Sequence, residues 1–216
     1  MIILIDNGHG KETAGKRSPD GKLLEWSWTR EIASKVQREL YGRGMDARLI
    51  VPEDRDVSLR ERCNRVNAVC DKAGRDGVLL VSIHVNAAGS GTTWMLAGGW
   101  SVWTSPGQTK SDILATDLWR AADEVLSEYK KRFEELRGQG CYSEAQRALR
   151  KDMTDGDEDY EARFAVLTGT RCAAVLTENM FQDNKSDVEW LLSDEGKMAI
   201  VRLHVEGIIN YINRGL

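Results

Sequence analysis

Cysteine is scarce in this sequence and is not arranged in pairs. The chain has 216 residues and four cysteines, whose spacing matches neither a zinc ribbon nor a redox motif. A chain of this length does not need disulfides to form a stable core, so we expect reduced thiols. Cys63 and Cys70 lie one heptad apart on an apolar helical stripe and are predicted to be core residues.

An excess of positive charge is missing, and so is any long apolar run. The 30 basic and 34 acidic residues give a formal charge of -4, so nothing indicates a nucleic-acid partner. The longest apolar runs, such as 78–81 and 173–176, are strand-sized, whereas a membrane span needs ~20 residues. The sequence opens on an apolar strand without a basic leader, so we expect no signal peptide, no membrane insertion and synthesis in the cytoplasm.

Apolar strands and amphipathic helices alternate along the chain. Strands are predicted from apolar runs that lack polar alternation, and helices from apolar residues at helical spacing. Their β-α-β-α-β order predicts a single α/β domain over residues 1–216, with a mostly parallel twisted sheet flanked by helices. The predicted strands are 2–5, 47–51, 78–83 and 173–177, and the predicted helices are 28–40, 59–73 and a terminal helix with capping-box spacing at 186–189.

The segment of about 88–159 follows this alternation poorly and reads as a variable, largely helical insertion. A short alternating piece at 100–104 predicts an edge strand. Apolar residues at helical spacing predict one long helix over Asp112–Leu136, and a lesser helical piece near 145–149. The acidic stretch 152–161 is predicted to be an exposed loop.

Two of the three histidines in the sequence fall at the carboxyl ends of predicted buried strands. His9 follows the first strand between two glycines, and His84 ends the third. Because such ends share one edge of a parallel sheet, the two imidazoles can converge there. With Glu25, at the start of the first helix, they form the ligand set of a hydrolytic zinc site with one open position. Two alternatives remain: His9 in an ordinary turn, and Glu25 complementing the helix dipole.

Two further carboxylates are predicted near this edge. Glu178 follows the strand 173–177 and would act beside a metal as general base and then as acid toward a leaving amine. An ordinary salt bridge is the alternative. Asp6 would orient a ligand histidine from behind, or cap the turn at Gly8.

A phosphate-binding loop is the competing interpretation of residues 10–16, which follow a strand with nearly the required spacing. However, Arg17 stands where a hydroxyl should reach magnesium. Ser18 and Pro19 interrupt the chain where the phosphate-binding helix should begin. The sequence therefore disfavours nucleotide hydrolysis.

Four short motifs, in order, resemble those of the zinc-dependent N-acetylmuramoyl-L-alanine amidases of the Amidase_3 type. Each lies in the structural setting predicted for it, and together they span most of the chain. They are Asp6-Asn7-Gly8-His9-Gly10, Glu25 before the first helix, Ser82-Ile83-His84-Val85-Asn86-Ala87, and Leu176-Thr177-Glu178-Asn179-Met180-Phe181-Gln182-Asp183-Asn184 with Asp187 beyond.

The resemblance implies Zn²⁺ held by His9, Glu25 and His84, with Glu178 as catalytic acid/base. It implies hydrolysis of the amide between muramic acid and L-alanine, with peptidoglycan or a muropeptide as substrate and action at the cell wall. The chain would then be a phage or prophage lysin, an exported protein or an effector. A catalytically inactive wall-binding module of the same fold is the alternative.

The resemblance also bears on regulation. In some relatives a helix in the region of the insertion covers the metal site until a partner withdraws it. The long helix Asp112–Leu136 would then be autoinhibitory and an activator protein would be needed. A surface helix packed on the sheet is the alternative.

Some residues around the motifs have open roles. Asn7 and Lys11 depart from the usual family residues; Lys11 would steer substrate carboxylates or be a solvated loop residue. Asn86 is expected behind the metal ligands or at the substrate. Trp100, with Trp94 and Trp103, would form a platform for sugar or peptide, or belong to the core. His204 lies on the terminal helical stripe, where a place beside the core is favoured over a fourth ligand.

Overall fold

Six strands form one sheet within residues 1–215, which the computed structural model describes; residue 216, the last of the expected domain, lies outside that range. The strands are β1 (Ile2–Asn7), β2 (Asp46–Leu49), β3 (Val78–Asn86), β4 (Ser101–Thr104), β5 (Tyr160–Glu161) and β6 (Ala173–Phe181), in the spatial order β2-β1-β3-β6-β4-β5. All neighbours are parallel except β4 and β6. The predicted single α/β domain with a mostly parallel sheet is confirmed.

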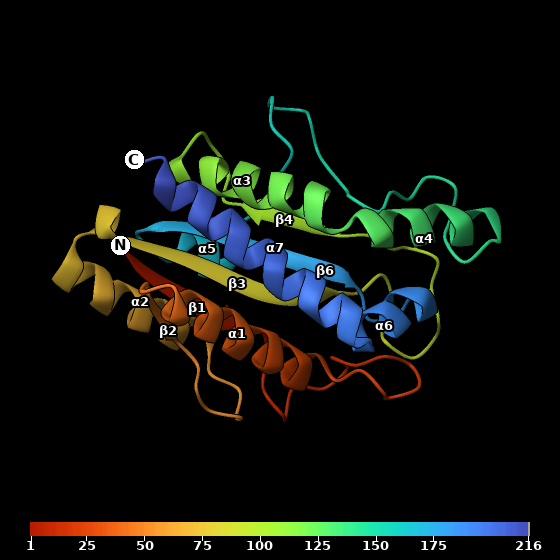
Figure 1. Ribbon diagram of the computed structural model, residues 1–216. Helices are drawn as coiled ribbons and strands as arrows, with labels where there is room; N and C mark the ends of the chain where they lie inside the picture. Colours follow the sequence, from red (N-terminus) through yellow and green to blue (C-terminus); the bar gives the residue numbers. More distant parts are fainter. Residues whose placement is uncertain (216) are drawn as a thin grey trace.

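Helices cover both faces of the sheet. They are α1 (Glu25–Gly42), α2 (Leu59–Ala73), the 3-10 turn η1 (Arg75–Gly77), α3 (Lys110–Val125), α4 (Ser127–Gly138), α5 (Ala165–Thr168), α6 (Lys185–Leu192) and α7 (Asp194–Asn213). Figure 1 shows α7 crossing the sheet between α1 and α3, and it contacts both. Helices α2 and α5 contact each other on the opposite face, so the domain has three layers.

The continuous apolar run of β1 follows from this arrangement. Ile3 and Ile5 belong to the larger core under α1, α3 and α7, whereas Leu4 belongs to the smaller core under α2 and α5. Successive strand residues point to opposite faces, so a strand covered on both faces needs apolar residues at every position. Cys63 and Cys70 are buried in α2, as predicted.

Side chains cap four of the helix starts within residues 1–215. Ser58 accepts a hydrogen bond from the Glu61 amide at 3.3 Å, which confirms the predicted start of α2. The predicted cap at Ser186 is wrong, because Asn184 accepts from the amides of Ser186 and Asp187 instead. A second helix then starts after Ser193, whose hydroxyl accepts from the Gly196 amide.

The second half of the chain departs from the prediction in local detail. The long helix is two helices, α3 and α4, that meet at Leu126. Residues 145–149 are not helical; Leu149 instead pairs with Trp100. The expected loop 152–161 ends in β5, which pairs with β4 and takes the sheet edge that we had predicted for β4. The strand predicted at 100–104 is thus confirmed as β4, although not at the edge, whereas β5, with two residues, carries too little periodicity to be recognised.

Helix α3 is part of the hydrophobic core. Leu114, Ala115, Leu118 and Ala122 are fully buried in the larger cluster, and α3 contacts α7, β4 and β6. This arrangement matches the alternative of a helix packed on the sheet. No helix within residues 1–215 is long and apolar enough to cross a membrane.

Candidate metal centre

His9 lies in the loop after β1, in a backbone conformation that residues other than glycine rarely adopt. Its φ is 61°, in the left-handed region. The His9 carbonyl accepts hydrogen bonds from the guanidinium groups of Arg30 at 3.0 Å and Arg62 at 3.3 Å. Thr29 donates to the Gly8 carbonyl at 3.1 Å. These three side chains hold the histidine in place and offset the backbone strain.

Glu25 is the first residue of α1 and is almost completely buried. Its Oε1 accepts a hydrogen bond from the Val85 amide at 3.0 Å and lies 3.2 Å from Nδ1 of His84 and 3.5 Å from Nε2 of His9. Its Oε2 is buried and accepts no hydrogen bond from any described residue. A buried carboxylate oxygen without a donor is expensive, which indicates that a further positively charged group belongs there.

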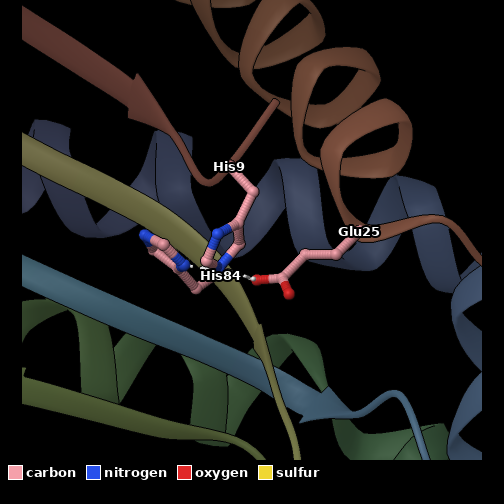
Figure 2. Close-up of side chains that lie close together, drawn as sticks. All are labelled: His9, Glu25 and His84. Carbon is pink, nitrogen blue, oxygen red and sulfur yellow. Dashed lines mark hydrogen bonds and ion pairs between the residues drawn. The ribbon is translucent and has the colours of Figure 1, made fainter. Parts of the chain in front are cut away.

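His84 projects from β3 toward the other two side chains, as Figure 2 shows. Its ring is perpendicular to that of His9, with centroids 5.1 Å apart. The strand was predicted to end at His84 but continues to Asn86, and the pairing with β6 shifts register between these two residues. This irregularity lies at the site itself, which is where such features commonly re-aim a side chain.

These three residues fit a metal ion. One ligand atom from each lies within 4.8 Å of the others. Two imidazole nitrogens and one carboxylate oxygen are the donor set of catalytic zinc sites, and tetrahedral bonds of ~2.0–2.2 Å place ligand atoms roughly 3.4 Å apart. The measured separations from Glu25 to the two histidines are 3.2 and 3.5 Å. The orphaned Oε2 of Glu25 supports the same conclusion.

The three groups shift each other's protonation. Burial, together with the charges of His84 and Lys16, lowers the pKa of His9 to about 4 despite Glu25. For Glu25, burial would raise the pKa, but the hydrogen bond and charge of His84 and the charge of His9 lower it overall. For His84, burial opposes the charged form, yet Glu25 raises the pKa. Glu25 is therefore ionised and His9 neutral at pH 7, and these are the forms that bind a metal.

Glu178 lies directly opposite His84 across the parallel pair β3–β6. Residues paired in this way share a face of the sheet, so both side chains point to the same side. Burial raises the pKa of Glu178 to about 7 and Glu25 adds to the effect, while His84, Lys16 and Arg150 oppose it. Its Oε2 is also buried without a hydrogen-bond partner among the described residues. A carboxyl with a pKa near neutrality can both accept and return a proton.

Within the described residues, Asp6 forms no hydrogen bond to a histidine or to the turn at Gly8. Its Oδ1 accepts from Nη1 of Arg62 at 2.5 Å and its Oδ2 accepts from Ser82 at 2.6 Å. Arg62 also donates to the carbonyl of Asn7 at 2.6 Å. Asp6 therefore acts on the His9 loop indirectly, through a buried ion pair that sequence reasoning did not find.

Trp100 is not a platform for substrate. It is fully buried, and its indole N–H donates to Asn179 Oδ1 at 2.9 Å, so its ring is closed to a ligand. Trp103 stacks on Tyr160, with ring centroids 4.7 Å apart. Trp94 is 39% exposed and remains available. Trp100 therefore belongs to the core, because β4, which begins at the next residue, lies inside the sheet between β6 and β5.

His204 belongs to the core, as predicted, and is not a ligand. It is fully buried, with Nδ1 2.7 Å from the Ile200 carbonyl and Nε2 2.9 Å from the Thr177 hydroxyl. Nδ1 therefore carries the proton that it donates to Ile200, and Nε2 accepts from Thr177. Burial lowers the pKa of His204 to about 4.

The remaining candidates lie at the margins of the site. Asn86 accepts a hydrogen bond from the Ala87 amide at 2.8 Å, and its carbonyl accepts from the Gln182 amide at 2.8 Å. Lys11 is exposed, and its amide donates to the carbonyl of Asp54. The lysine whose charge acts on His9 and Glu178 is Lys16, which sequence reasoning did not single out.

The loop after His9 has no phosphate-binding geometry. Its residues 10–16 are not followed by a helix until Glu25, and Arg17 instead pairs with Leu24 in an antiparallel bridge. A phosphate loop needs backbone amides at a helix N-terminus, so the nucleotide alternative fails. A cavity of about 310 Å³ is instead lined in part by two of the metal-ligand candidates, His9 and His84.

Comparison with known proteins decides the family. A model of the N-acetylmuramoyl-L-alanine amidase family matches residues 3–210. The chain belongs to this amidase family. The amidase CwlM of Bacillus licheniformis is 29% identical over 98% of this chain and 68% of its own length. The endolysin of Bacillus phage SPP1 is 27% identical over 98% of this chain and 66% of its own length. The chain thus spans about two thirds of each relative.

Solved amidase structures share the fold. The catalytic domain of CwlV from Bacillus (Paenibacillus) polymyxa var. colistinus superposes with a TM-score of 0.72 at 19% identity, covering 98% of both chains. The CwlD amidase of Clostridioides difficile, solved in complex with the GerS lipoprotein, has a TM-score of 0.69 at 18% identity and covers 99% and 98% of the chains. At such identities the likeness concerns the amidase fold alone.

Proposed function

We propose that this chain is a zinc-dependent hydrolase that cleaves the amide bond between N-acetylmuramic acid and L-alanine of peptidoglycan. The observation that carries the proposal is the convergence of His9, Glu25 and His84 around an unsatisfied Glu25 oxygen. Glu178 lies directly beside His84 on the next strand. Membership of the amidase family supplies the substrate class.

The metal ligands would be His9, Glu25 and His84. When bound, zinc polarises the scissile carbonyl and lowers the pKa of water. Arg30 and Arg62 hold the His9 backbone, and the Val85 amide fixes Oε1 of Glu25, so the ligand atoms are oriented before the metal arrives. This preorganisation lowers the entropic cost of binding the metal.

Glu178 carries out the proton transfers. Its ionised form accepts a proton from the attacking water, and the resulting acid returns the proton to the amine of L-alanine as the C–N bond breaks. With a pKa of about 7, both forms are accessible near neutral pH. The products are the muramic acid carboxylate and a stem peptide with a free amino terminus.

Hydrolysis of purified peptidoglycan tests this proposal. The protein, loaded with zinc, should release peptides that begin with a free L-alanine while the glycan chains stay intact. Activity should disappear with a chelator and return with zinc. Metal analysis should find about one zinc per chain, and His84→Ala should lose both zinc and activity. Cleavage within the glycan, or activity in the metal-free protein, would contradict the assignment.

The second candidate is a wall-binding module that has lost catalysis. A module that only binds has no need of Glu178, yet the residue is paired in register with His84, and its Oε2 is buried without a hydrogen-bond partner among the described residues. These features favour the enzyme. Binding to peptidoglycan without any peptide release would instead support the module.

The proposed substrate also indicates where the protein acts. An amidase of peptidoglycan acts at the cell wall after synthesis in the cytoplasm, as a phage or prophage lysin or as an exported protein. The variable segment 88–159 would be the part that distinguishes it from relatives. An activator protein remains a candidate partner, because one structural neighbour was solved with a lipoprotein.

A further inference from the structure

A row of side chains continues beyond the candidate centre across the sheet. His84 is paired with Glu178, and Glu178 is paired with Ser101 on β4. Trp100 is bridged in parallel to Leu149, and the Arg150 amide donates to the Trp100 carbonyl at 2.8 Å. Continued by one residue, this parallel register brings Arg150 next to Ser101. Because neighbouring positions in register share a face, His84, Glu178 and Ser101 line one side of the sheet, and Arg150 follows the bridge at the edge of this row.

Arg150 is close enough to act with Glu178. Two strand spacings of ~4.8 Å separate their backbones, and the residue between them, Ser101, is small and buried. The positive charge of Arg150 lowers the pKa of Glu178, whereas burial of the carboxyl raises it. An arginine side chain can therefore extend over Ser101 toward the reacting bond.

The guanidinium group of Arg150 is held in place but has no anionic partner. Its central carbon lies 5.4 Å from the ring centroid of Tyr160 and 5.2 Å from that of Phe181. Its Nη1 is buried without a hydrogen-bond partner, and Arg150 forms no ion pair with the part of the chain that the structure describes. Stacking on two rings orients the planar donors while leaving them free for a carboxylate.

Arg150 also opens onto a surface groove of about 640 Å³. Trp119, Lys151 and Tyr160 lie in its wall, and the amino group of Lys151 is 5.7 Å from the ring centroid of Trp119. The groove thus offers aromatic surface and a net positive charge next to Arg150. Its charged lining residues are four basic ones and two acidic ones, Lys130, Arg147, Arg150 and Lys151 against Asp123 and Glu134. Such a surface suits an extended, acidic peptide more than a neutral glycan.

We propose that Arg150 binds a carboxylate of the stem peptide and so positions the scissile amide against Glu178. The proposal rests on the amidase function proposed above. Arg150 is then a specificity-determining residue that discriminates acidic stem peptides from amidated ones. The alternative is a purely structural arginine that packs between Tyr160 and Phe181.

Paired substrates test this role. A muramoyl tripeptide would be prepared once with free side-chain and terminal carboxylates and once with these groups amidated. We expect Arg150→Gln to raise KM for the acidic substrate roughly 10- to 100-fold, the value of one charged hydrogen-bonded pair, with little change in kcat. KM for the amidated substrate should stay unchanged. Arg150→Lys should recover part of the preference, because it keeps the charge but loses the planar fork.

Arg48→Gln is the matched control, since Arg48 is exposed on β2, at the opposite edge of the sheet, and its guanidinium donates to Asp46. It should behave like the unsubstituted protein. Equal losses on both substrates in Arg150→Gln and Arg150→Lys, or no loss on either, would overturn the assignment of Arg150. Absence of hydrolysis of either substrate by the unsubstituted, zinc-loaded protein would overturn the proposed function itself.

Discussion

The ring of His84 occupies the space that a side chain on Gly8 would need. A Cβ at Gly8 would lie 2.5 Å from both Nδ1 and Cε1 of His84. Nδ1 is also the atom that faces Glu25. Gly8→Ala should therefore displace the histidine and weaken zinc binding roughly 10- to 100-fold, as loss of a supporting contact commonly does. Competition with a chelator measures the change in affinity.

A glycine in open space provides the control for this substitution. Gly42 is in α1, with no positive φ and with nothing near the position of an added Cβ. Gly42→Ala should leave zinc affinity unchanged and stabilise the helix slightly. Unaltered zinc affinity in Gly8→Ala would show that His84 can move without cost, and would contradict the rigid site described above.

The buried pair Arg62–Asp6 should be essential for stability. Both side chains are at most 3% exposed, with Nη1 2.5 Å from Oδ1. Arg62→Met leaves the Asp6 carboxylate buried without its partner, a change that typically costs about 3–5 kcal/mol. Urea unfolding should show this loss in the free energy of unfolding. The zinc affinity should fall as well, because Arg62 also holds the His9 carbonyl.

Two further variants separate charge from packing at this pair. The double variant Asp6→Asn with Arg62→Met should be more stable than Arg62→Met alone, because no unpaired charge remains. Arg48→Met breaks an exposed pair with Asp46 and should leave the free energy of unfolding nearly unchanged. If the double variant were no more stable than the single one, the loss would be due to packing.

The sequence predicted the frame of the fold because its central strands carry strong patterns. β1, β3 and β6 are covered on both faces, so their residues are continuously apolar and stand out in a single sequence. The short strands β4 and β5 could not be placed in the same way. They are four and two residues long, and their position in the sheet depends on partners far away in the chain.

The same reasoning explains which parts of the site were predictable. The three ligand candidates lie within or just after strands, or at a helix start, so their order along the chain indicated their convergence. Arg150 and Lys16 lie in irregular segments, and nothing in their local sequence ties them to Glu178. The partner of Asp6 was also hidden, because Arg62 looks like one more charged residue of α2. Such pairings are set by tertiary packing.

Glu178→Gln should abolish catalysis without disturbing the metal site. The amide keeps the shape of the side chain but cannot accept a proton, so kcat should fall roughly 10²- to 10⁴-fold. Zinc content should stay at that of the unsubstituted protein, since Glu178 is not among the ligand candidates. Full activity in this variant would refute the assigned role of Glu178.

The activity of the unsubstituted enzyme should depend on the protonation of Glu178. The first proton transfer needs the ionised carboxyl, and the pKa is raised to about 7 mainly by burial. Activity should therefore fall as the pH drops below the midpoint, with the slope of a single proton. Zinc held by the three ligand candidates would add positive charge nearby and would move the midpoint to pH 7 or below. A profile of kcat against pH at saturating substrate and zinc measures this midpoint.

His204 should make the folded state sensitive to acid. Its pKa is lowered to about 4 in the folded protein, against an ordinary value of 6.5, because it is fully buried. Between these pH values the unfolded chain binds a proton that the folded chain does not, so stability is complete above pH 6.5 and is lost as the pH falls toward 4. For this residue alone, the loss from pH 7 to pH 5 is about 2 kcal/mol.

His204→Phe isolates that contribution. The variant loses the hydrogen bonds to Ile200 and Thr177, so it should be less stable than the unsubstituted protein at pH 7. The gap should narrow by about 2 kcal/mol at pH 5, because phenylalanine does not titrate. The free energies of unfolding of both proteins are compared by urea unfolding in the presence of a chelator. The lowered pKa of His9 then contributes equally to the pH dependence of both. A gap that stayed constant from pH 7 to pH 5 would mean that His204 is protonated in the folded state.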